Sequence, residues 1–127
     1  MKRIGIIGTR RRDRREDLDK TYSAVSTELK EGDRIISGGC PKGGDRFAEV
    51  IAKQQGIPIT IFYPNWSKYG KGAGFVRNSD IAENSDILIA CVATDRTGGT
   101  ENTIQKFLKK INETEGSAIF KGLLVLV

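Results

Sequence analysis

The sequence predicts an α/β protein built on a five-stranded, mainly parallel sheet that is flanked by helices. Short apolar runs alternate with amphipathic stretches along the whole chain, and this alternation is typical of βα units. The 127 residues match the size of one domain, and 38% of them are hydrophobic, which is enough to form a core. We therefore expect a single domain that spans residues 1–127.

In the first half of the chain, the pattern predicts two strands that are each followed by a helix. The strands cover residues 3–7 and 34–37. Between them, apolar residues at spacings of four, three and four predict a helix that ends before Gly32, with a buried stripe formed by Leu18, Tyr22, Val25 and Leu29. The second helix has Asp45 as its expected N-cap, ends before Gly56, and turns inward Phe47, Ala48, Ile51 and Ala52.

The second half of the chain continues the alternation. A third strand is expected over residues 58–63, because proline is tolerated at the start of a strand. A glycine-rich connection then leads into a helix over about residues 75–84, and the apolar run 86–93 predicts a strand that is buried on both faces. After residues 97–100, the last helix packs through Ile104, Phe107, Leu108 and Ile111, and a strand over residues 122–127 closes the sheet.

Composition excludes several classes of protein. The chain has no histidine and two cysteines, so Ser-His and Cys-His nucleophile pairs, histidine-ligated zinc and tetrathiolate metal sites are ruled out, and we predict no metal. No apolar run approaches the roughly 18–20 residues of a membrane span, and the start of the sequence lacks the features of a signal peptide. We therefore expect a cytoplasmic protein with no membrane partner. The net charge of +5 favours a polyanionic or phosphate-bearing partner.

Three loops are predicted to meet at one edge of the sheet. Residues 8–12, 38–45 and 94–100 each follow a strand and precede a helix, so all of them lie at the carboxyl edge, where parallel α/β sheets bind ligands. Helix N-termini and glycine-rich backbone at this edge stabilise anions. Because GxxxxGK[ST] is absent and no GxGxxG follows the first strand, a P-loop ATPase or NAD dehydrogenase is disfavoured, and we expect no cofactor. The expected phosphate-contacting residues are Gly8, Gly38, Gly39, Gly43, Gly98, Gly99 and Thr100.

Several side chains could complete this anion site. Arg77, beside Asn78 in a segment without acids, has the planar fork that binds phosphate in a bidentate manner, and Arg10 follows the first strand directly. Trp66 and Tyr69 either stack on a base or close the loop over the core. The remaining arginines of the run 10–15 are either surface charges interleaved with acids or a nucleic-acid patch.

Four motifs in this order resemble the SLOG superfamily. They are Gly8-Thr9-Arg10, the stretch Ser37 to Arg46 with its four glycines, the string Trp66-(x)2-Tyr69-Gly70-(x)2-Ala73-Gly74-(x)2-Arg77-Asn78, and Gly98-Gly99-Thr100. The match is closest to the small stand-alone branch typified by YspA and extends more distantly to the Lonely Guy phosphoribohydrolases and DprA. The resemblance implies a Rossmann-like fold that binds a nucleotide or nucleotide-derived ligand. It places Gly38, Gly39 and Gly43 in the first phosphate loop, with Asp45 at the start of its helix.

The resemblance to the hydrolases has one departure. Their second glycine loop reads PGGxGTxxE, whereas this chain lacks the proline and one glycine and has Thr103 at the position of the acid. We therefore predict a binding protein for a phosphorylated nucleotide-like ligand. One alternative is a nucleoside 5′-monophosphate N-glycosidase that uses Glu101 or Asp45 as its catalytic carboxylate. Another alternative is single-stranded nucleic-acid binding, and a homodimer is compatible with the family likeness.

Overall fold

A computed structural model describes residues 1–114 and 122–127 and shows a five-stranded sheet of order β3-β2-β1-β4-β5. All four strand pairings are parallel, which confirms the α/β, Rossmann-like prediction. The strands are β1 (Arg3–Gly8), β2 (Arg34–Ser37), β3 (Ile59–Ile61), β4 (Ile87–Cys91) and β5 (Leu123–Leu126). The helices are α1 (Arg15–Glu28), α2 (Gly44–Gln55), α3 (Trp66–Tyr69), α4 (Ala73–Asn84) and α5 (Gly99–Glu113), with the 3-10 turn η1 (Gly70–Gly72) between α3 and α4.

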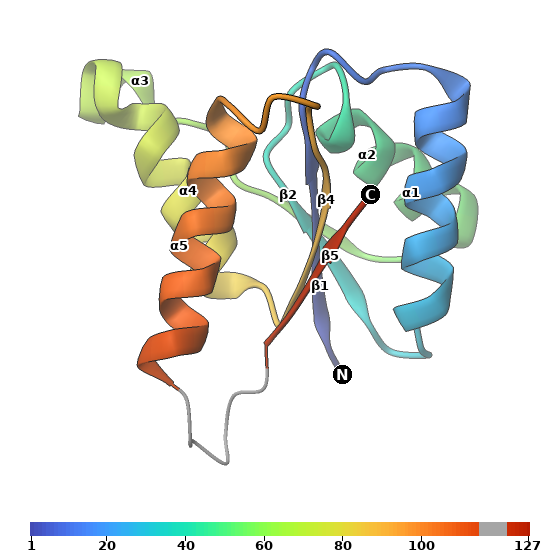
Figure 1. Ribbon diagram of the computed structural model, residues 1–127. Coiled ribbons are helices and arrows are strands. Elements are labelled where there is room, and N and C mark those ends of the chain that lie inside the picture. Colours follow the sequence, from blue (N-terminus) through green and yellow to red (C-terminus); the bar gives the residue numbers. More distant parts are fainter. Residues whose placement is uncertain (115–121) are drawn as a thin grey trace.

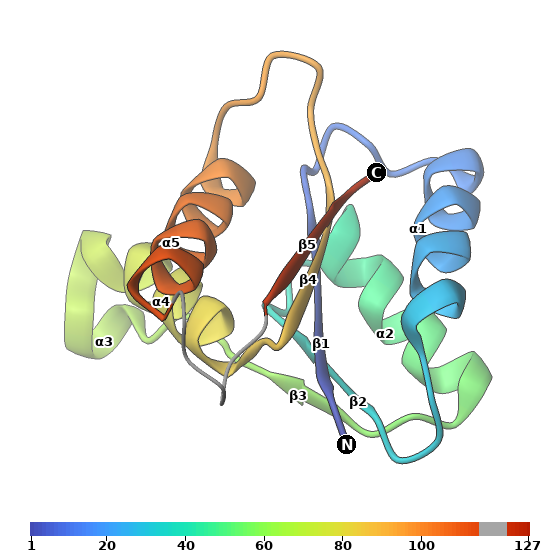
Figure 2. The same cartoon turned by 60° about the horizontal axis from the view of Figure 1, so that its bottom comes forward.

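The sheet is covered on both faces. Helices α1 and α2 lie against one face, and α4 and α5 lie against the other (Figures 1 and 2). Successive residues of β1 point to opposite faces, so Ile4 and Ile6 pack toward α1 and α2, whereas Ile7 packs toward α4 and α5. Strand β4 is buried along its whole length, as its apolar run predicts.

The structure adds buried polar residues to the predicted stripe of α1, extends the predicted helix 75–84 and shortens three of the predicted strands. As predicted, Leu18, Tyr22 and Leu29 pack with the buried Val25 against the core, although each of the three is half-buried. Asp17 and Thr21 are buried on the same helix. Apolar spacing misses Asp17 because its carboxylate is satisfied internally by Arg12 Nε at 2.9 Å. The glycine-rich connection is partly helical, because α3 is capped by Asn65 and α4 already begins at Ala73. Strands β3, β4 and β5 are shorter than the predicted ranges 58–63, 86–93 and 122–127.

The prediction that Asp45 is the N-cap of α2 is wrong. The N-cap is Gly43, which has a φ of 72°, and Asp45 lies buried in the first turn of the helix. A side chain at Gly44 would overlap the backbone of Ile7 and Gly8, so the helix starts in direct contact with the end of β1. This close approach places the first turn of α2, and Asp45 with it, at the carboxyl end of β1.

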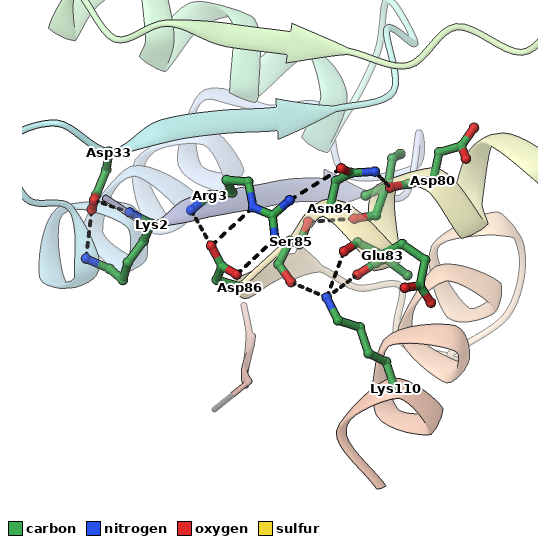
Figure 3. Close-up of polar contacts among 11 residues, drawn as sticks. Lys2, Arg3, Asp33, Asp80, Glu83, Asn84, Ser85, Asp86 and Lys110 are labelled. Atoms are coloured by element: carbon green, nitrogen blue, oxygen red, sulfur yellow. Dashed lines mark hydrogen bonds and ion pairs between the residues drawn. The ribbon is translucent and has the colours of Figure 1, made fainter. Parts of the chain in front are cut away.

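Ion pairs and a lysine fix the opposite, amino edge of the sheet (Figure 3). The Asp33 carboxylate accepts hydrogen bonds from the backbone and the side chain of Lys2, each at 2.8 Å. Asp86 accepts from the backbone of Arg3 at 2.8 Å and pairs with its guanidinium, while Lys110 Nζ donates to carbonyls at the end of α4. Burial raises the pKa of Asp86, but its bonds with Arg3 outweigh burial, and the pKa lies below its ordinary value of 3.8.

None of the helices in the described ranges combines the length and the apolar character that a membrane span requires.

Candidate functional site

The site lies at the carboxyl ends of β1 and β4, where the strand order reverses. A cavity of about 400 Å³ opens there. Its walls come from the loops that follow β1, β2 and β4 and from helices α2, α4 and α5, and Figure 1 shows these loops at the same end of the sheet. The lining residues are Ile7, Gly8, Thr9, Arg10, Arg11, Cys40, Asp45, Arg77, Asn78, Ile81, Thr97, Gly98, Gly99, Thr100 and Thr103.

The predicted site residues separate into two groups. Those that line the cavity are Gly8, Arg10, Asp45, Arg77, Asn78, Gly98, Gly99 and Thr100. Those that do not line it are Gly38, Gly39, Gly43, Trp66, Tyr69 and Glu101. Sequence reasoning did not assign Cys40, Thr97 and Thr103 to the site. Thr103 could have been found, because it lies one helical turn after Thr100 on the same side of the last helix.

Arg77 and Asn78, both on α4, connect the two glycine loops. Arg77 Nη1 donates to the carbonyl oxygen of Gly38 at 2.6 Å, and its Nε donates to Asn78 Oδ1 at 3.0 Å. Asn78 in turn donates through Nδ2 to Asn102 Oδ1 at 3.1 Å, at the start of α5. The Arg77 guanidinium is therefore held in the cavity wall by the protein itself, and two of its nitrogen atoms already have partners.

Asp45 is the buried acid of the cavity. Its side chain lies against Gly38, and its Oδ1 and Oδ2 are each 3.1 Å from a donor, which are Ser37 Oγ and the backbone N–H of Cys40. Burial raises the pKa of Asp45 above its ordinary value, although these hydrogen bonds and the charge of Arg77 oppose the shift. A buried carboxyl with a raised pKa can hold or release a proton toward a ligand in the cavity.

The carboxylate of Asp13 binds at the N-terminus of α2. Asp13 Oδ1 accepts from the backbone N–H of Gly43 and from Arg46 Nε, each at 2.8 Å. Gly43 also lies directly against the Thr9 carbonyl, so the loop after β1 covers this helix end. These bonds lower the pKa of Asp13, with the Gly43 bond as the largest cause. The Asp13 carboxylate therefore occupies the position in front of the first glycine loop where an anionic ligand would otherwise bind.

The N-terminus of α5 faces the cavity instead. Its N-cap, Gly98, has a φ of 99° and no side-chain cap, and residues 97–100 all line the cavity. The amides of its first turn have no intrahelical partners. Neither the hydroxyl of Thr100 nor the exposed guanidinium of Arg10 has a hydrogen bond or ion pair with any other described residue. This side of the cavity thus combines unpaired donors with an unpaired positive charge.

The neighbouring arginine has a different role from Arg10. Arg11 forms a bidentate pair with Asp95, at 2.6 and 2.9 Å, and also donates to Thr97 Oγ1. Hydrogen bonds from Arg11 and Thr97 hold the pKa of Asp95 far below its usual range. This arrangement ties the loop after β1 to the loop after β4 across the mouth of the site.

The second acid proposed for catalysis has a partner outside the cavity. Glu101 accepts two hydrogen bonds from Arg96, from Nε at 2.8 Å and from Nη2 at 2.7 Å. Of the remaining arginines in the basic run, Arg12, Arg14 and Arg15 pair with Asp17, Glu16 and Asp19. These three ion pairs agree with the interpretation of the run as surface charges interleaved with acids.

Comparison with solved structures finds one similar fold. The structure of the molybdenum cofactor binding protein from the phototrophic bacterium Rippkaea orientalis superposes with a TM-score of 0.69 at 22% sequence identity. The match covers 99% of this chain and 77% of that chain, and it supports the fold. No protein-family model and no curated protein sequence matches the chain.

Proposed function

We propose that this protein binds a nucleotide or a nucleotide-derived phosphorylated ligand in the cavity at the carboxyl edge. The observation that carries this proposal is the unpaired guanidinium of Arg10 in a cavity that also contains the uncapped N-terminus of α5. A guanidinium without an ion-pair partner and free backbone N–H groups in one hollow favour an anionic group such as phosphate. The volume of about 400 Å³ lies in the range of pockets that hold one small molecule.

The distribution of hydrogen-bond donors and acceptors determines the orientation of the ligand that we propose for the cavity. The phosphate would lie at Gly98, Gly99 and Thr100 with Arg10 as its counter-ion, because the corresponding position at α2 holds Asp13. The other end of the ligand would meet the carboxyl of Asp45, which accepts hydrogen bonds from hydroxyl or amino groups. A nucleoside monophosphate has phosphate, sugar hydroxyls and a base, and it fits this order of groups.

The family resemblance agrees with this proposal. We infer a SLOG-like, YspA-like protein, since the second glycine loop and the Arg-Asn pair expected from that likeness line one cavity, to which the first glycine loop contributes Cys40 and Asp45. The similar structure from Rippkaea orientalis is that of a protein that binds a cofactor, which supports small-molecule binding on this fold and leaves the ligand's identity to experiment.

Native mass spectrometry of freshly purified protein tests the proposal. We expect a bound species whose mass corresponds to a phosphorylated nucleotide or a derivative of one. If the protein purifies empty, calorimetric titration with a panel of nucleoside monophosphates should show binding at one site. A bound molecule without an anionic group, or no binding across the panel, would contradict the proposal.

A second candidate function is N-glycosidase activity toward the bound nucleotide. The observation in its favour is the buried carboxyl of Asp45 in the cavity, whose raised pKa suits a general acid. Glu101 has no comparable position, because it pairs with Arg96 and does not line the cavity. Asp45 is therefore the carboxylate on which such a reaction would depend.

A further inference from the structure

The exposed aromatic side chains of the described residues lie in one segment. Tyr63, Trp66, Tyr69 and Phe75 are 67%, 60%, 42% and 59% exposed, whereas Phe47 and Phe107 are completely buried. Exposure of large aromatic rings costs hydrophobic free energy, so a cluster of them indicates a contact surface. None of the four lines the cavity described above, so the proposed nucleotide site leaves them unused.

The same segment carries positive charge only. No acidic residue lies between Glu49 and Asp80, while Lys68 and Lys71 are exposed beside the aromatic rings. Lys68 Nζ lies 5.1 Å from the centroid of the Tyr69 ring, which places a cation directly over an aromatic face. Trp66, Lys68, Tyr69, Lys71 and Phe75 are all exposed within one short stretch of the chain, and we call this set the α3 platform.

The fold holds the α3 platform out from the body of the protein. Helix α3 lies beside α4 at the margin of the molecule, on the side away from the sheet, in both views (Figures 1 and 2). Asn65 fixes the helix by accepting from the backbone N–H of Lys68 at 3.1 Å. Positions Gly70 and Gly72 have open space around them, so the backbone next to the rings can be approached closely.

We propose that the α3 platform binds single-stranded nucleic acid, a function beyond the nucleotide site. Aromatic faces stack on unpaired bases, and lysines neutralise the phosphates between them, which is the combination used by proteins that bind single strands without sequence preference. A second copy of this chain is a poorer occupant, because the platform is basic and the chain as a whole carries +5. The exposed side chains are aromatic and not aliphatic, which favours bases over the apolar face of a protein.

Trp66 is the only tryptophan of the chain and provides a direct probe of this surface. We expect titration with an oligothymidylate of about 12 nucleotides, within the span of one binding module, to quench its fluorescence. Neutralisation of two phosphates by Lys68 and Lys71 predicts that log K falls with log salt at a slope of about −1.4. A saturating nucleoside monophosphate should leave the quenching unchanged, because the platform does not line the cavity.

Two variants separate stacking from charge. Tyr69→Leu keeps apolar bulk but removes the ring, and it should weaken binding about 10-fold through loss of base stacking. The double variant Lys68→Gln and Lys71→Gln should flatten the salt dependence. The matched control, Lys30→Gln with Lys53→Gln, removes the same charge from exposed positions outside the platform and should bind as the native chain does. Circular dichroism spectra and thermal midpoints should show that all variants are folded.

Several results would overturn the proposal. They are the absence of quenching at low salt, equal affinity for a duplex of the same length, and equally tight binding of polyglutamate, which would reduce the interaction to charge alone. Sedimentation velocity provides the last test. A dimer that dissociates in Trp66→Ser would assign the platform to self-association and overturn the nucleic-acid proposal.

Discussion

The hydroxyl of Ser37 lies between two oxygen atoms, 3.1 Å from Oδ1 of Asp45 and 2.8 Å from the carbonyl oxygen of Ile6. A serine hydroxyl has one proton and can donate it to only one of these acceptors at a time. When the Asp45 carboxyl is protonated, it donates to Ser37 Oγ, and the hydroxyl donates to Ile6, so both hydrogen bonds form. Burial of Asp45, which raises its pKa, favours the same protonated form.

Asp45 should make folding stability depend on pH. Because the folded-state pKa lies above the ordinary value of 3.8, the folded chain binds more protons, and deprotonation penalises the folded state as pH rises through the raised pKa. The penalty is absent below the ordinary value. We expect the free energy of unfolding, measured with urea, to fall as pH rises from the ordinary value of 3.8 through the raised pKa of Asp45, and we expect Asp45→Asn to remove this component of the curve.

The choice of pH window separates Asp45 from the other perturbed acids. Asp33 and Asp86 have lowered pKa values, so their stabilisation is complete above the ordinary value of 3.8 and is lost only as pH falls toward their folded-state pKa values. Asp33→Asn should therefore change the slope of the curve only as pH falls below the ordinary value of 3.8, and it should preserve the slope that Asp45 produces above that value. Parallel curves for native protein and Asp45→Asn would show that Asp45 titrates normally.

Gly38 should be intolerant of a side chain. A Cβ at this position would lie 2.8 Å from Arg77 Nη1 and 2.8 Å from Asp45 Oδ2, so it would push the Arg77 guanidinium and the Asp45 carboxyl apart. We expect Gly38→Ala to cost about 1–3 kcal/mol through overpacking and to weaken ligand binding. The control is Gly72→Ala, where no atom lies within 4 Å of the added Cβ, and it should retain native stability and affinity. Urea unfolding and calorimetry measure both effects.

The sequence predicts the sheet and helices well because their signals are local. All five strands and the inward face of α2 follow from runs and spacings within a few residues, such as Phe47, Ala48 and Ile51. The short helix α3 is not predicted, because four residues are too few to show a periodic pattern and its cap at Asn65 depends on side-chain geometry. The position of Asp45 also depends on a tertiary contact, the packing of Gly44 against β1.

The site is predictable in outline but not in its pairings. The rule that places loops at the carboxyl edge brings together Gly8, Gly98 and Gly99, because it depends only on strand and helix order. The bond between Asp13 and Gly43 joins residues 30 positions apart, and no local pattern shows that this acid occupies the first glycine loop. The pairing of Glu101 with Arg96 is local, yet Arg96 has a positive φ of 55°, a backbone conformation that the sequence does not specify.

Hydrolysis assays on carboxamide variants test the glycosidase candidate. Incubation with nucleoside 5′-monophosphates, followed by chromatography for free base, measures the activity. If base is released, Asp45→Asn should abolish the release, whereas Glu101→Gln should change the rate by no more than about twofold, because Glu101 lies outside the cavity. Loss of activity in Glu101→Gln with retention in Asp45→Asn would reverse the assignment. Absence of release with intact binding would leave a sensor or carrier role.

The adjacent residues Arg10 and Arg11 should affect different properties, because Arg10 contributes to nucleotide affinity and Arg11 contributes to stability. Arg10 has no partner among the described residues, so Arg10→Gln should leave the thermal midpoint unchanged while it weakens nucleotide affinity about 10-fold or more, the size of a charge-assisted hydrogen bond. Arg11 bridges Asp95 and Thr97, so Arg11→Gln should lower the thermal midpoint by releasing that loop. Arg10→Lys keeps the charge but loses the planar fork, and an intermediate affinity is expected. Equal affinities for native protein and Arg10→Gln would remove Arg10 from the site, because no other change accompanies the loss of its charge.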